Sequence, residues 1–286
     1  MIIWIASYPK SGNTWIRALL SAYLFSEDGK FSFNLLKNIE QFSSKYFLSN
    51  ITDNLNYQER ISKNWIPSQK EINKDKKIHL FKTHNAICSI NGHKFTDKLN
   101  TIGGIYIVRD PRNLILSISR HYGLNFEEAY NFLTNKRKII FPVNIENNEK
   151  NIKESEDFNF LGDWSTHYQS WKNINFCPIK VIKYEDCLID AQKVFVSTLN
   201  FLSKFLKFEF DKKKINSSLT STSFKNLSQM ENKEGFHESA TSPKTMKNIK
   251  FFYLGKKNNW KSLLDKKIVK KIESRFKNEM SELGYL

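Results

Sequence analysis

Four short apolar segments, rich in β-branched residues, recur along the chain, and each runs into a polar loop. They cover residues 1–7, 77–82, 104–108 and 179–183. Runs of this length and composition predict buried β-strands. The first strand is ended by Pro9, which cannot donate to a strand ladder.

Helical periodicity follows the first, third and fourth of these segments. After the first, the apolar residues that fall on one helical face are Ile16, Leu19, Leu20, Tyr23 and Leu24. Asp110 as N-cap and Pro111 at the first helical position predict a helix that reaches about His121, and residues 191–206 predict another. Strands that alternate with helices predict one α/β domain over residues 1–286. Its central sheet is mainly parallel and flanked by helices, with the working loops at the carboxyl ends of the strands.

The loop between the first strand and its helix is predicted to bind an anion. Ser11, Gly12, Asn13 and Thr14 would present backbone N–H groups and hydroxyls at a helix N-terminus, where Lys10 adds a positive charge. Phosphate or sulfate suits this P-loop-like strand-loop-helix. The G-x-x-x-x-G-K-[ST] spacing of triphosphate-binding loops is absent, because Lys10 precedes the only glycine. A metal-dependent triphosphate enzyme is therefore not the first interpretation.

The charge and the cysteine content limit the classes of protein to which the chain can belong. The 45 Lys and Arg against 29 Asp and Glu give a formal charge of +16, which permits nucleic acid, an acidic membrane surface or a small polyanion as partner. Much of the excess lies in runs such as 212–214 and 266–271, which are typical of solvated helix faces. The three cysteines are irregularly spaced, and no apolar run approaches the ~18 residues of a membrane span. The first strand leaves no room for a signal peptide, so we expect a cytoplasmic protein.

Two motifs carry a resemblance to a known family. Residues 8–15, from Tyr8 to Trp15, resemble the loop with which sulfotransferases hold the 5′-phosphosulfate of 3′-phosphoadenosine 5′-phosphosulfate (PAPS). The run from Ile107 to Asn113, followed by Ser117, resembles the second sulfotransferase motif. This resemblance implies that Arg109 and Ser117 grip the 3′-phosphate of the nucleotide. A guanidinium suits that task because its planar fork pairs two phosphate oxygens at once.

The resemblance also implies the catalytic groups. His84, in Lys82-Thr83-His84, resembles the family's catalytic base, which takes the proton of the acceptor as it attacks sulfur. Lys10 would lie against the bridging oxygen and stabilise charge on the leaving nucleotide. The other histidines have no comparable setting in the sequence; they are His79, His93, His121, His167 and His237.

Weaker matches complete the nucleotide site. Trp15 resembles the tryptophan that stacks on adenine, and Tyr184, Thr222 and Phe224 lie in segments that resemble the rest of the adenine pocket. Residues 252–261 resemble the family's C-terminal phosphate loop through Gly255, Trp260 and Lys261. Tyr253 and Leu254, however, stand where a basic pair is expected. Lys256 or Lys257 would supply the missing charge to the 3′-phosphate if the loop shifts.

The sequence is therefore interpreted as a metal-free, PAPS-dependent sulfotransferase of the cytosolic type. It would transfer a sulfuryl group to a hydroxyl or amine of a small-molecule, glycan or lipid acceptor and release 3′-phosphoadenosine 5′-phosphate (PAP). One alternative is a phosphoryl transferase whose Mg²⁺ is held by Asp110 or Asp186. A basic nucleic-acid-binding protein is a second alternative, although nucleic acid is not the favoured partner. A nucleotide-binding but inactive protein is a third. The acceptor and the oligomeric state are open.

Overall fold

Four parallel strands form the central sheet of the computed structural model, which describes residues 1–42, 57–140, 158–241 and 248–286. They are β1 (Ile2–Ser7), β2 (His79–Thr83), β5 (Thr101–Val108) and β8 (Ile179–Lys183), in the order β2-β1-β5-β8. Ile5 is in register with Lys82 on one side and Ile105 on the other. All four predicted strands are confirmed, with bounds that differ by up to three residues.

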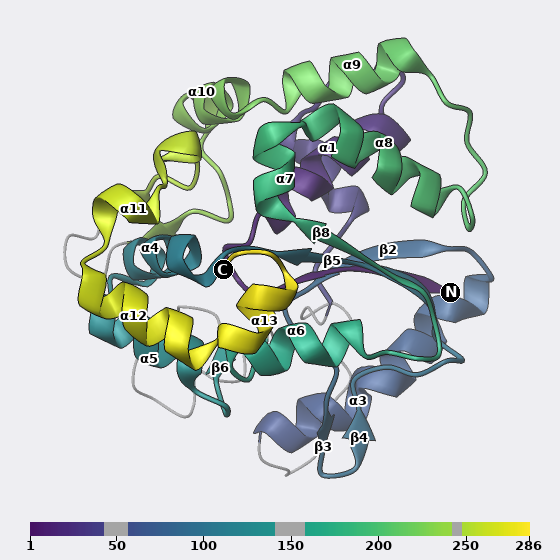
Figure 1. Cartoon of the computed structure of the whole chain (residues 1–286). Coiled ribbons are helices and arrows are strands. Elements are labelled where there is room, and N and C mark those ends of the chain that lie inside the picture. The colour runs from purple at the N-terminus through teal and green to yellow at the C-terminus, as the bar shows by residue number, and fades with distance from the viewer. Residues whose placement is uncertain (43–56, 141–157, 242–247) are drawn as a thin grey trace.

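Helices cover both faces of the sheet, as Figure 1 shows. One face carries α1 (Asn13–Phe25), α7 (Tyr184–Ile189), α8 (Ala191–Leu202) and α9 (Lys212–Ser221). The other carries α3 (Tyr57–Ile72), α4 (Pro111–Tyr122), α5 (Phe126–Thr134), α6 (Trp164–Lys172), α12 (Lys266–Arg275) and α13 (Lys277–Glu282). This is the α/β fold that the sequence predicts.

The remaining elements are short. They are the helices α10 (Phe224–Glu234) and α11 (Trp260–Leu263), the 3-10 helices η1 (Phe33–Asn38), η2 (Asn73–Asp75) and η4 (Gly255–Lys257), and three two-stranded ribbons: β3 (Ser89–Ile90) with β4 (His93–Lys94), β6 (Ile139–Ile140) with β7 (Asn159–Phe160), and β9 (Ala240–Thr241) with β10 (Asn248–Ile249). Within the described residues, no helix is long and apolar enough to span a bilayer.

The side-chain alternation of β1 explains why the sheet is buried on both sides. Ile2 and Trp4 pack into the core on the α4 and α6 side, whereas Ile3 and Ile5 pack into the core on the α1 and α8 side. Successive side chains of a strand point to opposite faces, so an apolar residue is needed at each position from Ile2 to Ala6. This burial fixes the strand, and with it the position at which the loop after Ser7 leaves the sheet.

The helix bounds follow local capping. Asp110 caps α4 by accepting a hydrogen bond from the Arg112 N–H at 2.9 Å, and Pro111 occupies the first turn, as predicted. The helix predicted over residues 191–206 ends earlier, at Leu202. Ser203 donates its N–H to the Leu199 carbonyl, and the following residues form turns.

Candidate active site

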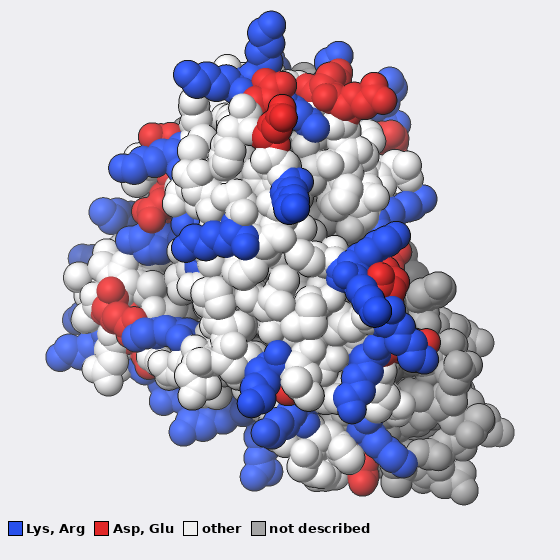
Figure 2. Space-filling view, turned by 90° about the vertical axis from the view of Figure 1, so that its right-hand side faces the viewer, with Lys and Arg blue, Asp and Glu red and all other residues white. Residues whose placement is uncertain are grey.

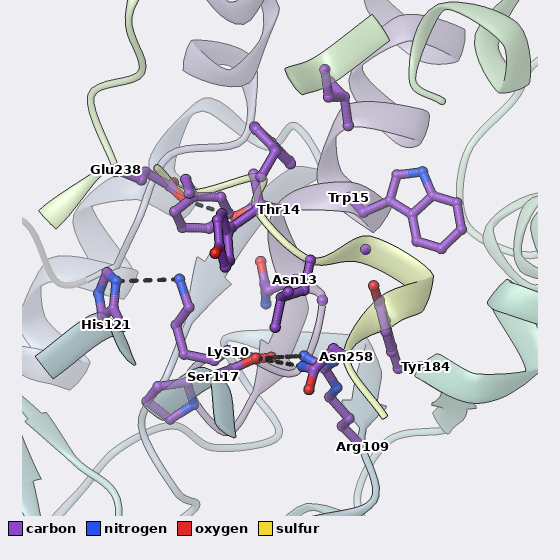
Figure 3. A pocket seen from close by; sticks show the side chains of 18 of the residues that line it. Lys10, Asn13, Thr14, Trp15, Arg109, Ser117, His121, Tyr184, Glu238 and Asn258 are labelled. Atoms are coloured by element: carbon purple, nitrogen blue, oxygen red, sulfur yellow. Dashed lines mark hydrogen bonds between the residues drawn. The ribbon is translucent and has the colours of Figure 1, made fainter. Parts of the chain in front are cut away.

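A cavity of about 810 Å³ opens at the carboxyl edge of the sheet, where the loops after β1, β2, β5 and β8 meet. This is where parallel sheets place their ligands. It brings together most of the predicted site residues; the ones that line it are Lys10, Gly12, Asn13, Thr14, Trp15, His84, Arg109, Ser117, Tyr184, Phe224 and Gly255. Figure 3 shows several of them from close by.

The loop between β1 and α1 is shaped by Gly12. Its φ of +100° is left-handed, and a Cβ at this position would lie 2.3 Å from Cδ2 of Tyr184, so only glycine fits here. The Gly12 carbonyl accepts hydrogen bonds from the N–H groups of Trp15 and Ile16 and thereby starts the helix. The N–H groups before this point have no acceptor within the helix. They form the positive end of the α1 dipole at the cavity.

His84 lines the cavity, and its ring is anchored to the backbone of β1. Its Nδ1 lies 2.7 Å from the carbonyl oxygen of Ser7, and a carbonyl only accepts, so Nδ1 carries the proton. The lone pair is therefore on Nε2. Burial lowers the pKa of His84 to about 3, and the positive charge of Lys82 acts in the same direction. The imidazole is therefore neutral at neutral pH, with Nε2 unprotonated.

The side chain of Lys10 crosses the same cavity. Its Nζ lies 3.3 Å from Nδ1 of His121 and 3.6 Å from the ring centre of Phe251. Burial lowers the pKa of Lys10 to about 7, and neighbouring positive charges add to this effect against the opposing charge of Glu238. Sequence motifs assign no functional setting to His121 and His237, but both residues line this cavity. For His121 a signal was present, because it follows Ser117 by four residues on one helix face.

Arg109 and Ser117 lie in contact although eight residues separate them. Nη1 of Arg109 donates to Oγ of Ser117 at 3.1 Å and to the Lys10 carbonyl at 3.0 Å, so it ties the β1 loop to α4. The guanidinium also lies 4.4 Å from the ring centre of Tyr184. Arg109 is only 6% exposed, and its Nε has no partner within the described residues. A buried donor of this kind needs an acceptor.

The C-terminal loop closes this end of the cavity through Asn258. Its Nδ2 donates to Oγ of Ser117 at 2.9 Å, and the Trp260 N–H donates to Oδ1 of Asn113 at 3.0 Å. These two bonds hold the loop against α4, and Figure 3 shows Asn258 beside Ser117 and Arg109.

Two predicted residues, Ser11 and Thr222, do not line the cavity, and a third, Lys256, has a side chain that the structure does not describe. Ser11 is fully buried behind the loop, and its N–H donates to the Tyr8 carbonyl at 3.3 Å. The Thr222 hydroxyl donates to the Ser218 carbonyl at 2.7 Å. Residues 29–75 and 124–159 are described only in part; Gln41, Ile140 and Asn159 from these two segments line the cavity.

A family model of the sulfotransferase domain matches residues 2–284. The chain belongs to the sulfotransferase family. Its fold is shared with mouse sulfotransferase SULT7A1 complexed with PAP, at 18% identity and a TM-score of 0.58 over 99% of this chain and 85% of that one. It is also shared with retinol dehydratase in a complex with retinol and PAP, at 16% identity and a TM-score of 0.54 over 98% and 81%. The predicted family is confirmed.

One carboxylate of this sulfotransferase, Glu238, escaped the sequence analysis. It accepts hydrogen bonds from Oγ1 of Thr14 at 2.7 Å, from Nη1 of Arg17 at 2.6 Å and from Nζ of Lys82 at 3.1 Å. Burial alone would raise the pKa of Glu238, but the charges of Lys82 and Arg17 outweigh it and hold the pKa well below its usual range. Glu238 therefore joins the segment before β9 to the start of α1, beside the loop that is predicted to bind an anion (Figure 3).

Replacing Glu238 by alanine is expected to lower the free energy of unfolding by about 3 kcal/mol, because it leaves the buried Arg17 and Lys82 without their shared carboxylate. A folded-state pKa below the unfolded value means that this contribution is present above the unfolded pKa and is lost as the pH falls through the folded pKa. Urea unfolding at neutral and acid pH measures both effects. Glu234→Ala, at an exposed site on α10, is the matched control. Equal losses in the two variants would contradict the expectation.

Proposed function

We propose that this protein is a PAPS-dependent sulfotransferase in which His84 is the general base and Lys10 stabilises the leaving group. One observation carries the proposal. The α1 N-terminus, Lys10 and His84 open into the same cavity as the Arg109–Ser117 pair. PAPS has two anionic ends, a phosphosulfate and a 3′-phosphate, and the cavity offers cationic groups at two separate places. The PAP in both solved structures of the same fold supports this assignment.

The chain's own residues fit such a nucleotide. Gly12 allows close approach to the backbone N–H groups at the start of α1, which suit the phosphosulfate. The unpartnered Nε of buried Arg109 suits the 3′-phosphate. Trp15 and Tyr184, whose ring centres lie 6.0 Å apart in an edge-on arrangement, would hold the adenine together with Phe224.

The proposed reaction is an in-line displacement at sulfur. The acceptor oxygen or nitrogen forms a bond to sulfur while the bond from sulfur to the bridging oxygen breaks. Nε2 of His84 takes the acceptor's proton, since Nδ1 is committed to Ser7. Lys10 and the α1 dipole stabilise the negative charge that collects on the bridging oxygen as PAP leaves.

The acceptor is proposed to be a small molecule with a hydroxyl or amine. Retinol, an alcohol, is bound in one of the solved structures of this fold.

The three cysteines are free thiols, which supports a reducing, cytoplasmic location.

Two of the three sequence alternatives, the phosphoryl transferase and the nucleic-acid-binding protein, draw less support from the site. A phosphoryl transferase would need Asp110 or Asp186 for Mg²⁺, but Asp110 caps α4 and accepts a hydrogen bond at 2.7 Å from Nη2 of Arg112. Neither aspartate lines the cavity. For a nucleic-acid-binding protein, a continuous basic patch is expected. Figure 2 shows the Lys and Arg side chains of one face dispersed, with acidic side chains among them.

The test is a calorimetric titration with PAP in Mg²⁺-free buffer, followed by incubation with PAPS and a panel of one phenol, one aliphatic alcohol and one amine. Micromolar PAP binding, weakened more than tenfold in Arg109→Ala, and a sulfated product detected by mass are expected. Wild-type protein that binds no PAP would overturn the proposal. PAP binding with no product from any acceptor class would overturn the transferase step.

A further inference from the structure

The loop that carries Tyr253 and Leu254 lacks the expected basic pair at these two positions, and it is docked against α4. Asn258 donates to Ser117 at 2.9 Å, and η4 spans Gly255–Lys257. With Gly255 at φ +53° and a Cβ there only 3.0 Å from the Phe224 ring, the loop has little room to shift. A shifted loop is therefore not the source of a replacement cation.

A second arginine, Arg120 of α4, lies next to Tyr253. The guanidinium carbon of Arg120 lies 3.4 Å from the ring centre of Tyr253, a close cation–π contact. Arg120 follows Ser117 by three residues, so both lie on one face of the helix. Arg120, Tyr253 and Ser117 all line the cavity. The aromatic ring at 253 thus holds a cation that another element supplies.

The two arginines at this end of the cavity form no ion pair among the described residues. Among the described residues, the arginines with a carboxylate within ion-pair distance are Arg17, Arg112 and Arg275, and neither Arg109 nor Arg120 is one of them. Two guanidinium groups without carboxylates favour an anion.

The Ser117 hydroxyl adds a donor. Its oxygen accepts from Arg109 at 3.1 Å and from Asn258 at 2.9 Å, which uses both of its lone pairs. The hydroxyl proton is then left to donate. Arg109 Nε, the Ser117 hydroxyl and the Arg120 guanidinium together form a donor set at one end of the cavity.

We propose that Arg120, held on the ring of Tyr253, is a specificity-determining residue that binds the 3′-phosphate of the nucleotide beside Arg109 and Ser117. Tyr253 is a positioning residue, because its ring holds the Arg120 guanidinium through the cation–π contact. This inference rests on the proposed function. It assigns the missing positive charge to α4 rather than to Lys256 or Lys257. Its consequence is selective, because Arg120 would favour nucleotides that carry a 3′-phosphate and leave those without one unaffected.

The experiment compares binding affinities by calorimetry. PAP and adenosine 5′-phosphate, which lacks the 3′-phosphate, are each titrated into the wild type and into Arg120→Ala. We expect PAP to bind roughly tenfold more weakly to Arg120→Ala, since a hydrogen bond to a charged group is lost. Adenosine 5′-phosphate should change less than about twofold. Tyr253→Ala should reproduce part of the PAP loss, and Tyr253→Phe, which keeps the ring, should not. Arg137→Ala, an exposed arginine that does not line the cavity, is the matched control for charge.

The outcomes separate this inference from the proposed function. If the wild type binds neither nucleotide, the proposed nucleotide site itself is wrong, and with it the proposed function. If the wild type prefers PAP, an equal loss for both nucleotides in Arg120→Ala would overturn the assignment of Arg120 to the 3′-phosphate. So would a selective PAP loss in Lys256→Ala with none in Arg120→Ala.

Discussion

Substituting His84 by glutamine is expected to reduce kcat for sulfuryl transfer by roughly a thousandfold, which is within the range for loss of a general base. Glutamine retains an amide near the Ser7 carbonyl, which His84 contacts at 2.7 Å, but has no basic nitrogen to replace Nε2. PAP affinity should stay within about twofold of the wild type, because the imidazole is neutral and makes no charge pair with the nucleotide. Single-turnover rates with PAPS, for an acceptor from the panel above, measure the effect.

Two further observations distinguish a base from a structural residue at this position. His93→Gln, on the β4 ribbon away from the cavity, is the matched control and should be unchanged. Added imidazole should restore part of the rate in His84→Ala, since a diffusible base can enter the space that is left. A PAP affinity that falls as far as the rate, with no rescue, would show that His84 supports the site instead of performing the proton transfer.

The fold was predictable because the relevant signals are local. β1 needs an apolar residue at each position up to Ala6, since Ile2 and Ile3 face opposite cores, and this requirement is visible as an uninterrupted run. The Asp110–Pro111 start of α4 is equally local. The pairing of Arg109 with Ser117 did not follow from local geometry, since Ser117 lies about two turns beyond Asp110; the resemblance to the family motif implied it, and the structure shows the contact at 3.1 Å.

The parts of the site that escaped prediction are long-range pairs. Glu238 contacts Thr14 across 224 positions of sequence, and neither neighbourhood carries a pattern that predicts the other. In the sequence, Arg120 has the pattern of a solvated arginine in the last turn of α4. Its contact with Tyr253 is visible only in the structure. Residue types and strand ends indicated where the cavity would form. Only the packing of the C-terminal loop against α4 indicates which cations gather there.

Lys10 is expected to make both nucleotide binding and turnover depend on pH near neutrality. Its pKa is lowered to about 7 in the free protein by burial, so above that pH the amine is largely uncharged. An anion at the α1 N-terminus favours the charged form, which means that binding above pH 7 takes up a proton. The contribution of Lys10 to affinity is therefore greatest below its pKa and declines by up to tenfold for each pH unit above it.

Comparison with Lys10→Met isolates this effect, because the phosphates of PAP titrate identically in both titrations. The ratio of the two affinities should be roughly thirtyfold near pH 6 and should shrink toward a few-fold near pH 9, and kcat of the variant should be about a thousandfold lower at neutral pH. Calorimetry in two buffers of different ionisation enthalpy counts the proton taken up. Lys212→Met, on the exposed start of α9, should leave the ratio to wild type flat and near one. An affinity ratio for Lys10→Met that is independent of pH would mean that Lys10 stays charged throughout, and that its burial against Phe251 and His121 does not govern its proton.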